Sequence, residues 1–188
     1  MRVIAGEYRS RILQAPRGLD TRPTSDRLRE TLFNILAPRI KGSVFLDLYA
    51  GSGAVGVEAL SRGTREAIFV EEAAAAMKAI RANLASLGIR GNYVLEPRGV
   101  ATALRRLAEQ RRAADIVFLD PPYSQAAAYE ETLGLLGGAC RGVLAENAAV
   151  IAEHEKRRDL DVRYGALEQY RVLRQGDAAL SFYRIGVE

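Results

Sequence analysis

Short apolar runs that alternate with helical patterns constrain the fold of this 188-residue chain more than any other feature. The runs are rich in β-branched residues, and their starts lie about 23 to 34 residues apart. Five runs have this character: residues 44–48, 67–70, 92–95, 115–119 and 149–152. Near-continuous apolar strands with helices between them are typical of a parallel sheet covered on both faces. The sequence therefore predicts an α/β fold.

The segments between and after these runs complete the pattern. Residues 72–87 predict a helix, because their apolar residues share one face and Gly88 provides a stop. Two further apolar runs, residues 167–174 and 179–185, flank the turn-forming residues 175–178 and predict an antiparallel hairpin. We therefore expect a seven-stranded, mostly parallel, Rossmann-like sheet that ends in a hairpin.

A basic extension, residues 1–41, precedes the predicted domain of residues 42–188. Residues 2–5 and 11–13 predict a small β-hairpin, and residues 24–36 predict an amphipathic helix. The extension carries nine Lys and Arg against four Asp and Glu (9 − 4 = +5), whereas the remainder carries 18 against 19. Because the arginine fork matches phosphate groups, this clustering favours an RNA-facing surface. The candidate phosphate contacts are Arg2, Arg9, Arg11, Arg22, Arg27 and Arg29.

A glycine-rich turn follows the first apolar run of the predicted domain. Gly51, Gly53 and Gly56 fit the pattern G-x-G-x-x-G between a strand and a helix, and Glu71 follows Gly51 by 20 residues. This arrangement binds nucleotide-type cofactors, with the acidic residue on the ribose hydroxyls. Glycines that only shape a tight strand-to-helix turn are the alternative interpretation.

Asp47 helps to choose the cofactor. A carboxylate beside the glycine turn would repel a pyrophosphate on the helix N-terminus. It would attract the ammonium and sulfonium groups of S-adenosylmethionine, so charge complementarity favours that cofactor over NAD. Asp47 could also fasten the loop by accepting backbone N–H bonds, and the two roles can coexist.

A second candidate site, Asp120-Pro121-Pro122-Tyr123, directly follows the fourth apolar run and so lies beside the glycine turn. The two prolines stiffen the backbone and remove two N–H donors. The Asp120 carboxylate and the Pro121 carbonyl can accept both hydrogens of an exocyclic amino group on a base, and Tyr123 can stack on that base. We expect Asp120, Pro121 and Tyr123 to be catalytic; a merely structural turn is the alternative.

These motifs resemble the RsmD-type methyltransferases of bacterial small-subunit ribosomal RNA. The resemblance covers nearly the whole chain and is most diagnostic at Arg22-Pro23-Thr24-Ser25-Asp26-Arg27-Leu28-Arg29-Glu30. It implies a class I methyltransferase fold. It also implies transfer of a methyl group from S-adenosylmethionine to the N2 amine of a guanine in 16S rRNA. The small size of the chain suggests an assembled small-subunit particle as the substrate.

The same resemblance completes the set of expected cofactor contacts. Thr24 lies near the methionine end of the cofactor in this interpretation, or else caps the following helix. No acidic residue is placed after the third strand to meet the adenine amine, so backbone groups near Gly99 and Val100 are expected to read the adenine. The full set is Asp47, Tyr49, Gly51, Gly53, Glu71, Gly99, Val100 and Thr24.

Three other functions remain as alternatives to this one. A DNA adenine-N6 or cytosine-N4 methyltransferase shares the glycine turn and the Asp120 motif, but usually carries a larger target-recognition insert. An NAD-dependent oxidoreductase has no use for Asp47 or the Asp120 motif. A non-catalytic RNA-binding module on a methyltransferase scaffold is disfavoured by the intact motif.

Composition excludes several further classes. A single cysteine, Cys140, excludes an internal disulfide, and one cysteine with one histidine, His154, cannot assemble a structural zinc site. No apolar run approaches the roughly 20 residues that cross a bilayer, and the N-terminus lacks the apolar region of a signal peptide. We expect a cytoplasmic monomer that binds neither metal nor membrane.

Overall fold

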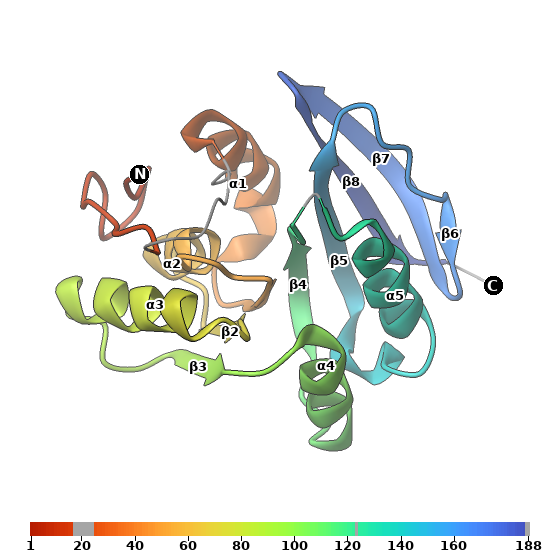
Figure 1. Cartoon of the computed structure of the whole chain (residues 1–188), viewed down its shortest axis with the longest axis horizontal. Helices are drawn as coiled ribbons and strands as arrows, with labels where there is room; N and C mark the ends of the chain where they lie inside the picture. The colour runs from red at the N-terminus through yellow and green to blue at the C-terminus, as the bar shows by residue number, and fades with distance from the viewer. Residues whose placement is uncertain (17–24, 123, 187–188) are drawn as a thin grey trace.

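The computed structural model of the chain describes residues 1–16, 25–122 and 124–186. In these residues the strands form an eight-stranded sheet in the order β3-β2-β1-β4-β5-β8-β7-β6 (Figure 1). The strands are β1 (Val44–Leu48), β2 (Glu66–Val70), β3 (Tyr93–Glu96), β4 (Ala114–Leu119), β5 (Leu144–Glu155), β6 (Arg163–Tyr164), β7 (Leu167–Gln175) and β8 (Ala178–Ile185). The helices are α1 (Asp26–Ile40), α2 (Ala54–Ser61), α3 (Ala74–Ser86), α4 (Val100–Glu109) and α5 (Ala126–Gly137), with a 3₁₀ turn η1 (Arg141–Val143).

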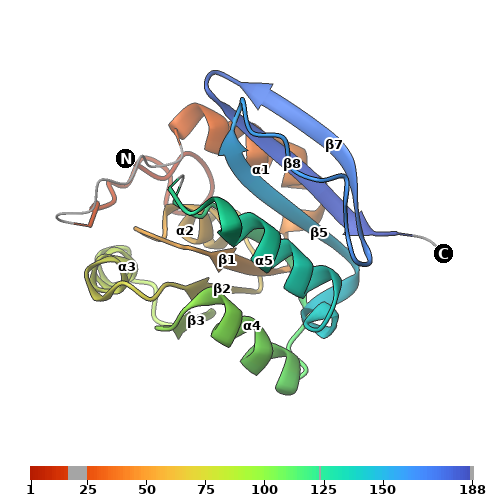
Figure 2. The same ribbon diagram turned by 45° about the vertical axis from the view of Figure 1, so that its right-hand side comes forward.

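The five predicted core strands are confirmed as a parallel array, β3-β2-β1-β4-β5. Their side chains are buried on both faces because helices cover each side. Helices α4 and α5 pack on one face, while α1, α2 and α3 pack on the other (Figure 2). Phe45 and Leu46, neighbours on β1, illustrate this: they belong to clusters on opposite faces, and both are fully buried.

The strand order places a topological switch point between β1 and β4. From β1 the chain moves outward through β2 and β3, and then returns to β4 on the other side of β1. The crevice at the carboxyl ends of these two strands is where open α/β sheets bind ligands. Both predicted motifs, the glycine turn after β1 and Asp120-Pro121 after β4, therefore meet there.

Within residues 1–16, 25–122 and 124–186 the sheet has eight strands, so the predicted count of seven was wrong. The antiparallel hairpin is confirmed as β7 and β8, and β8 pairs antiparallel to β5. The additional strand, β6, has only two residues and pairs with the start of β7 around Gly165. A two-residue strand is too short to produce a periodic apolar pattern, which is why the sequence did not indicate it.

The first long helix begins later than predicted and extends further. Ser25 is its N-cap, and the Ser25 hydroxyl accepts a hydrogen bond from the Leu28 backbone N–H at 3.1 Å. The alternative role of Thr24 as the cap is therefore wrong; Thr24 itself lies outside the described residues. The helix continues through Pro38 to Ile40, since apolar packing of its buried stripe against the sheet outweighs the proline.

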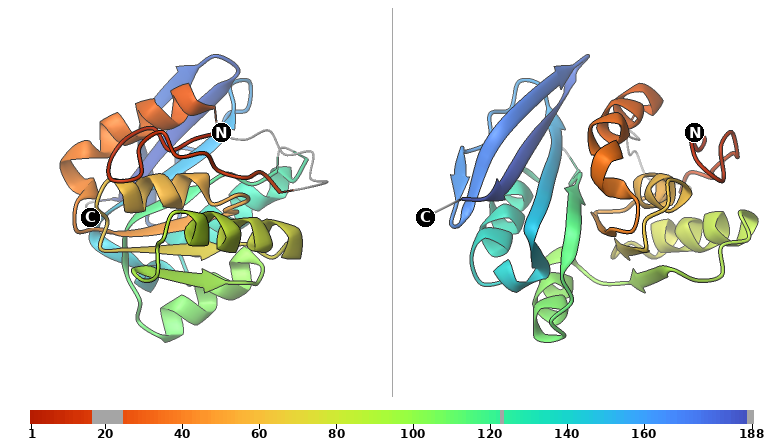
Figure 3. Two further views of the ribbon diagram at one scale, coloured as in Figure 1. Left: turned by 90° about the vertical axis from the view of Figure 1, so that its left-hand side faces the viewer. Right: turned by 180° about the vertical axis from the view of Figure 1, so that it is seen from behind.

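The predicted N-terminal hairpin is reduced to one antiparallel bridge, Arg2↔Ile12. Side chains of α2 hold the turn instead. The Glu58 carboxylate accepts hydrogen bonds from the backbone N–H groups of Ile4 (2.8 Å) and Ala5 (3.0 Å). At Gly6, φ is +84°, and a Cβ would lie 1.8 Å from the Ser61 carbonyl oxygen, so only glycine fits. Figure 3 shows this coil running along α2.

Arg29 is not a phosphate contact, contrary to its inclusion among the candidate arginines. Its side chain is fully buried, donates to the Asp26 carboxylate at 2.9 Å and to the Arg2 carbonyl, and lies 3.9 Å from the Glu58 carboxylate. Burial lowers the pKa of Arg29, although Glu58 and Asp26 oppose this shift. Arg29 thus joins α1, α2 and the N-terminal segment from inside.

Candidate active site

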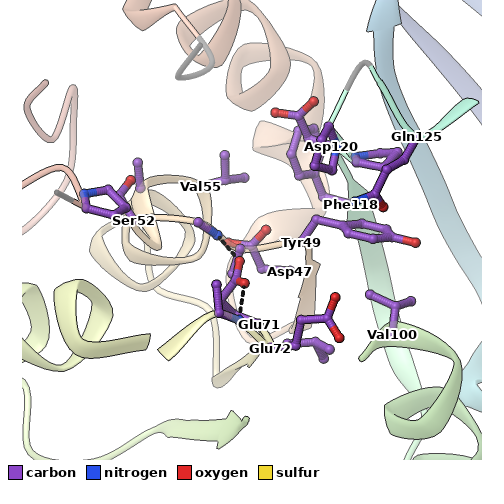
Figure 4. Close-up of a pocket in the computed structure, with 18 of the residues that line it drawn as sticks. Asp47, Tyr49, Ser52, Val55, Glu71, Glu72, Val100, Phe118, Asp120 and Gln125 are labelled. Atoms are coloured by element: carbon purple, nitrogen blue, oxygen red, sulfur yellow. Dashed lines mark hydrogen bonds between the residues drawn. The ribbon is translucent and has the colours of Figure 1, made fainter. Parts of the chain in front are cut away.

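A cavity of about 540 Å³ opens at the switch point of the sheet. Residues from the carboxyl ends of β1, β2 and β4 form it, together with the N-terminal segment and the start of α4 (Figure 4). The predicted site residues that line it are Asp47, Tyr49, Gly51, Glu71, Gly99, Val100, Asp120 and Pro121. The structure thus brings together residues that are spread over more than seventy positions of the sequence.

The three glycines of the turn have different structural roles. Gly51 (φ +55°) lines the cavity, and space around it is open. Gly53 is not among the described lining residues; it is the left-handed N-cap of α2, and a Cβ there would approach Ile80 at 3.1 Å. At Gly56 a Cβ would lie 2.3 Å from the Phe69 ring. Gly56 therefore permits close helix-to-strand packing, and the assignment of Gly53 to the cofactor stays a prediction.

Glu71 organises the glycine turn. One carboxylate oxygen accepts from the Gly51 backbone N–H and the other from the Ala73 backbone N–H, each at 2.8 Å (Figure 4). These bonds hold the carboxylate at the carboxyl end of β2. Each oxygen retains a lone pair that can accept a further hydrogen bond. Its neighbour Glu72, which the sequence analysis did not select, also lines the cavity. The only signal for Glu72 was its adjacency to Glu71.

Asp47 holds the glycine turn in place from inside the protein. Its side chain is buried at 1% exposure, and its carboxylate accepts a hydrogen bond from the Gly56 backbone N–H at 2.9 Å. Burial raises the pKa of Asp47 to about 8, although the Gly56 bond opposes this shift. The nearby Glu71 raises the pKa further. The loop-fastening interpretation is therefore confirmed, while attraction of a cationic cofactor stays a prediction.

Replacing Asp47 with asparagine should flatten the pH dependence of stability. The pKa of Asp47 is about 8 in the folded protein and 3.8 in the unfolded chain. Between pH 4 and pH 8 the native protein therefore keeps a proton that the unfolded chain has released. This group's contribution to stability is thus complete below pH 4 and is lost as pH rises through 8, at about 1.4 kcal/mol per pH unit. Asparagine still accepts the Gly56 bond but does not titrate.

Urea unfolding of both proteins between pH 5 and pH 9 measures this effect. We expect Asp47→Asn to gain stability relative to the natural protein as pH rises. A constant difference between the two proteins across this range would contradict a strongly raised pKa at Asp47.

Tyr49 forms another wall of the cavity. Its backbone is left-handed (φ 60°), which is unusual for a bulky residue. The phenol shares a 2.8 Å hydrogen bond with the Thr132 hydroxyl of α5. Burial raises the pKa of Tyr49, so the phenol is neutral at pH 7. The strained turn thus places a fixed ring between the glycine loop and α4 (Figure 4).

The start of α4 supplies the floor expected for the adenine. Gly99 is the N-cap of α4, and Val100 is its first residue. A Cβ on Gly99 would lie 3.0 Å from a Glu72 carboxylate oxygen, so glycine allows Glu72 to approach. The nearby acid Glu96 pairs with Arg98 at 2.7 Å and is not among the described lining residues. Contact with the adenine through Gly99 and Val100 stays a prediction.

Asp120 lies on the opposite side of the cavity from Glu71 and Glu72, and Pro121, the next residue, also lines the cavity. Figure 4 shows Asp120 and Gln125 together at the end of β4. Pro121 is buried, which makes this edge rigid. Tyr123, the predicted stacking residue, lies outside the described residues, and so do Thr24 and Arg22.

The remaining candidate arginines lie on the N-terminal segment and α1. Arg2, Arg9, Arg11 and Arg27 are all exposed. Arg11 donates to the Ser86 carbonyl at 2.8 Å. The same segment also contributes Met1, Ala15 and Pro16 to the cavity wall, a role that sequence reasoning missed.

In the described part of the chain, no helix is long and apolar enough to span a membrane. No group of three His, Cys, Asp or Glu side chains gathers there closely enough to hold a metal ion.

Comparison with known proteins places this architecture in a family. The family model described as Conserved hypothetical protein 95 matches residues 1–184. Ribosomal RNA small subunit methyltransferase D of Escherichia coli is 41% identical over 82% of this chain and 75% of that protein. The Haemophilus influenzae protein of the same name is 33% identical over 98% of this chain and 92% of that protein.

Solved structures agree with this placement. The structure of the Escherichia coli protein yhhF is 36% identical and has a TM-score of 0.83, covering 100% of this chain and 99% of that one. The expected class I methyltransferase fold and the resemblance to RsmD-type proteins are both confirmed. This chain belongs to the Conserved hypothetical protein 95 family, the family that contains the RsmD-type methyltransferases.

Proposed function

We propose that this chain methylates the exocyclic N2 amine of a guanine in 16S rRNA, with S-adenosylmethionine as the methyl donor. The family uses S-adenosylmethionine, and relatives carry the name of ribosomal RNA small subunit methyltransferases. One observation carries the proposal: Asp120, followed by Pro121 in the cavity lining, lies across the cavity from Glu71, which holds the glycine turn. A base amine and a methyl donor can therefore meet there.

The charges around the cavity fit S-adenosylmethionine. Besides the buried Asp47, whose raised pKa keeps it protonated at pH 7, three acidic side chains line it, Glu71, Glu72 and Asp120, against one basic side chain, Arg98, among the described lining residues. This balance favours a ligand with ammonium and sulfonium groups and disfavours a pyrophosphate. Glu71 is already oriented by the glycine turn, so it can accept from ribose hydroxyls without reorganisation.

The proposed chemistry depends on positioning. S-adenosylmethionine would supply the methyl group: its S–CH3 bond would break as the N–C bond forms, S-adenosylhomocysteine would leave, and the methylated amine would release one proton to solvent. The Asp120 carboxylate and the Pro121 carbonyl would each accept a hydrogen bond from the amine. These two bonds would turn the nitrogen lone pair toward the methyl group of S-adenosylmethionine. The target base must leave its stack to reach this edge, and we assign Tyr123 to stack on it.

Residues 1–41 supply the proposed RNA-facing surface. Arg2, Arg9 and Arg11 are exposed on the N-terminal segment, which contributes Met1, Ala15 and Pro16 to the cavity wall, and Arg27 is exposed on α1. Their charge can hold phosphates on either side of the extruded base. A chain of 20.5 kDa offers limited surface, so we propose the assembled small-subunit particle as the substrate. Equal activity on naked 16S rRNA would contradict this part of the proposal.

Methyl transfer from radiolabelled S-adenosylmethionine tests the proposal. The protein is given small subunits from cells that lack it, naked 16S rRNA, and duplex DNA, and the labelled nucleoside is identified. N2-methylguanosine in small subunits is the expected product. N6-methyladenine or N4-methylcytosine in DNA would replace the substrate assignment, and absence of label with intact cofactor binding would favour a non-catalytic binding module.

A further inference from the structure

The side-chain amide of Asn83 is fully buried and forms hydrogen bonds to two segments at the cavity, the N-terminal segment and the glycine turn. It lies on α3, and its Oδ1 accepts a hydrogen bond from the Gln14 backbone N–H at 2.7 Å. Its Nδ2 donates to the Gln14 carbonyl at 3.0 Å and to the Ser52 carbonyl at 2.9 Å. Both amide hydrogens are thus used, and these partners fix which end of the amide is oxygen.

The two partners of Asn83 belong to different parts of the proposed site. Ser52 lies in the glycine turn and lines the cavity. Gln14 immediately precedes Ala15 and Pro16, which line the same cavity from the N-terminal segment. One side chain therefore joins the glycine turn to the N-terminal segment, and both line the cavity.

The segment needs such a bond because it has little regular structure of its own. Its described residues form a single antiparallel bridge, at Arg2 and Ile12. Val3 and Leu13 bury their side chains in the cluster formed with α3. Asn83 holds the Gln14 backbone through two hydrogen bonds, one from its N–H and one to its carbonyl, and so fixes the position of Gln14 next to Ala15 and Pro16. Figure 3 shows the segment crossing above α3.

We propose that Asn83 is a positioning residue that couples binding of S-adenosylmethionine to binding of RNA, an inference that rests on the proposed function. A cofactor that contacts the glycine turn and the segment favours the joined arrangement. RNA bound to Arg2, Arg9 and Arg11 of the same segment favours that arrangement too. By linkage, each ligand then strengthens the other by the same factor. Asn83 itself contacts neither ligand.

A binding cycle measures this coupling directly. The probes are S-adenosylhomocysteine, followed by calorimetry, and small ribosomal subunits from cells that lack the enzyme. For the natural protein we expect bound subunits to tighten S-adenosylhomocysteine by at least about fivefold. For Asn83→Ala we expect this factor to fall to about one, and the Kd for S-adenosylhomocysteine alone to rise about tenfold. The KM for S-adenosylmethionine should rise more than kcat falls.

Two further variants separate coupling from folding. Asn147→Ala is the matched control, since it makes the same change at an exposed position of β5, outside residues 1–41 and outside the cavity lining. Gln14→Pro removes the backbone N–H that donates a hydrogen bond to Asn83 Oδ1, and it leaves α3 unchanged. This variant should also lower the coupling factor. It serves as the test if Asn83→Ala does not fold by circular dichroism.

The outcomes distinguish failure of this inference from failure of the proposed function. An unchanged coupling factor in Asn83→Ala or Gln14→Pro, or a factor of one in the natural protein, would overturn the inference. Absence of RNA binding and methylation in the natural protein would overturn the proposed function instead. In that case the Kd for S-adenosylhomocysteine alone tests the inference. If the Kd of Asn83→Ala lies within twofold of the Kd of the natural protein, the result contradicts positioning by this residue.

Discussion

Asp120→Ala should lose about 10²- to 10⁴-fold in kcat for methyl transfer to small subunits, the range for a group that positions a reacting atom and its proton. The change removes the carboxylate acceptor beside Pro121, so the amine is no longer held with its lone pair toward the methyl donor. The Kd for S-adenosylhomocysteine should stay within about twofold, since Asp120 lies opposite the Glu71 side of the cavity. Single-turnover transfer of labelled methyl groups and calorimetry measure these two quantities.

The control for this prediction is Glu130→Ala, which removes an exposed carboxylate from α5 near the same loop. It should leave both quantities unchanged. Loss of RNA binding in Asp120→Ala, with normal transfer once RNA is saturating, would assign Asp120 to substrate binding and contradict a role in aligning the amine.

Glu58→Ala should destabilise the protein by about 3–5 kcal/mol, the cost of breaking a buried ion pair by removing one partner. The Glu58 side chain is fully buried and accepts from Ile4, Ala5 and the Arg62 guanidinium (2.8 Å). Its loss leaves the Arg29 guanidinium buried beside Asp26 alone, and leaves two backbone N–H groups without their acceptor. Urea unfolding followed by circular dichroism gives the free energy of unfolding.

Glu30→Ala is the matched control, because Glu30 is exposed on α1. A change there should stay within about 0.5 kcal/mol. A loss below about 1 kcal/mol in Glu58→Ala would mean that the N-terminal segment detaches and Arg29 reaches solvent. That result would contradict the view that Glu58 anchors the segment to the domain.

The division at residue 41 follows charge rather than packing. The basic excess does lie in residues 1–41. Yet α1 shares a buried cluster with β1, β4, β5 and β8, and Leu13 shares another with α3. Charge is visible in the sequence, whereas the contacts of an extension with distant helices are not. The boundary therefore stays a prediction about function.

The sequence by itself determined the five parallel strands, the C-terminal hairpin and the placement of the two motifs at the switch point. Periodicity is a local property, so it revealed the five parallel strands and the β7–β8 hairpin, and motif spacing placed Gly51, Glu71 and Asp120 at one sheet edge. It also indicated the two roles of Asp47 without choosing between them.

Only the tertiary structure decided which polar groups are buried and what they contact. Arg29 and the exposed Arg27 are two residues apart on one helix, yet Arg29 faces Glu58 inside the protein. In the sequence, Asn83 is one polar residue of a predicted helix. In the structure, its amide forms hydrogen bonds with Gln14 and Ser52. Such partners are 31 to 69 residues away in sequence, and no local pattern records a hydrogen bond across that separation. The energetic cost of an unpaired buried polar group nevertheless makes these bonds decisive for how the site is held together.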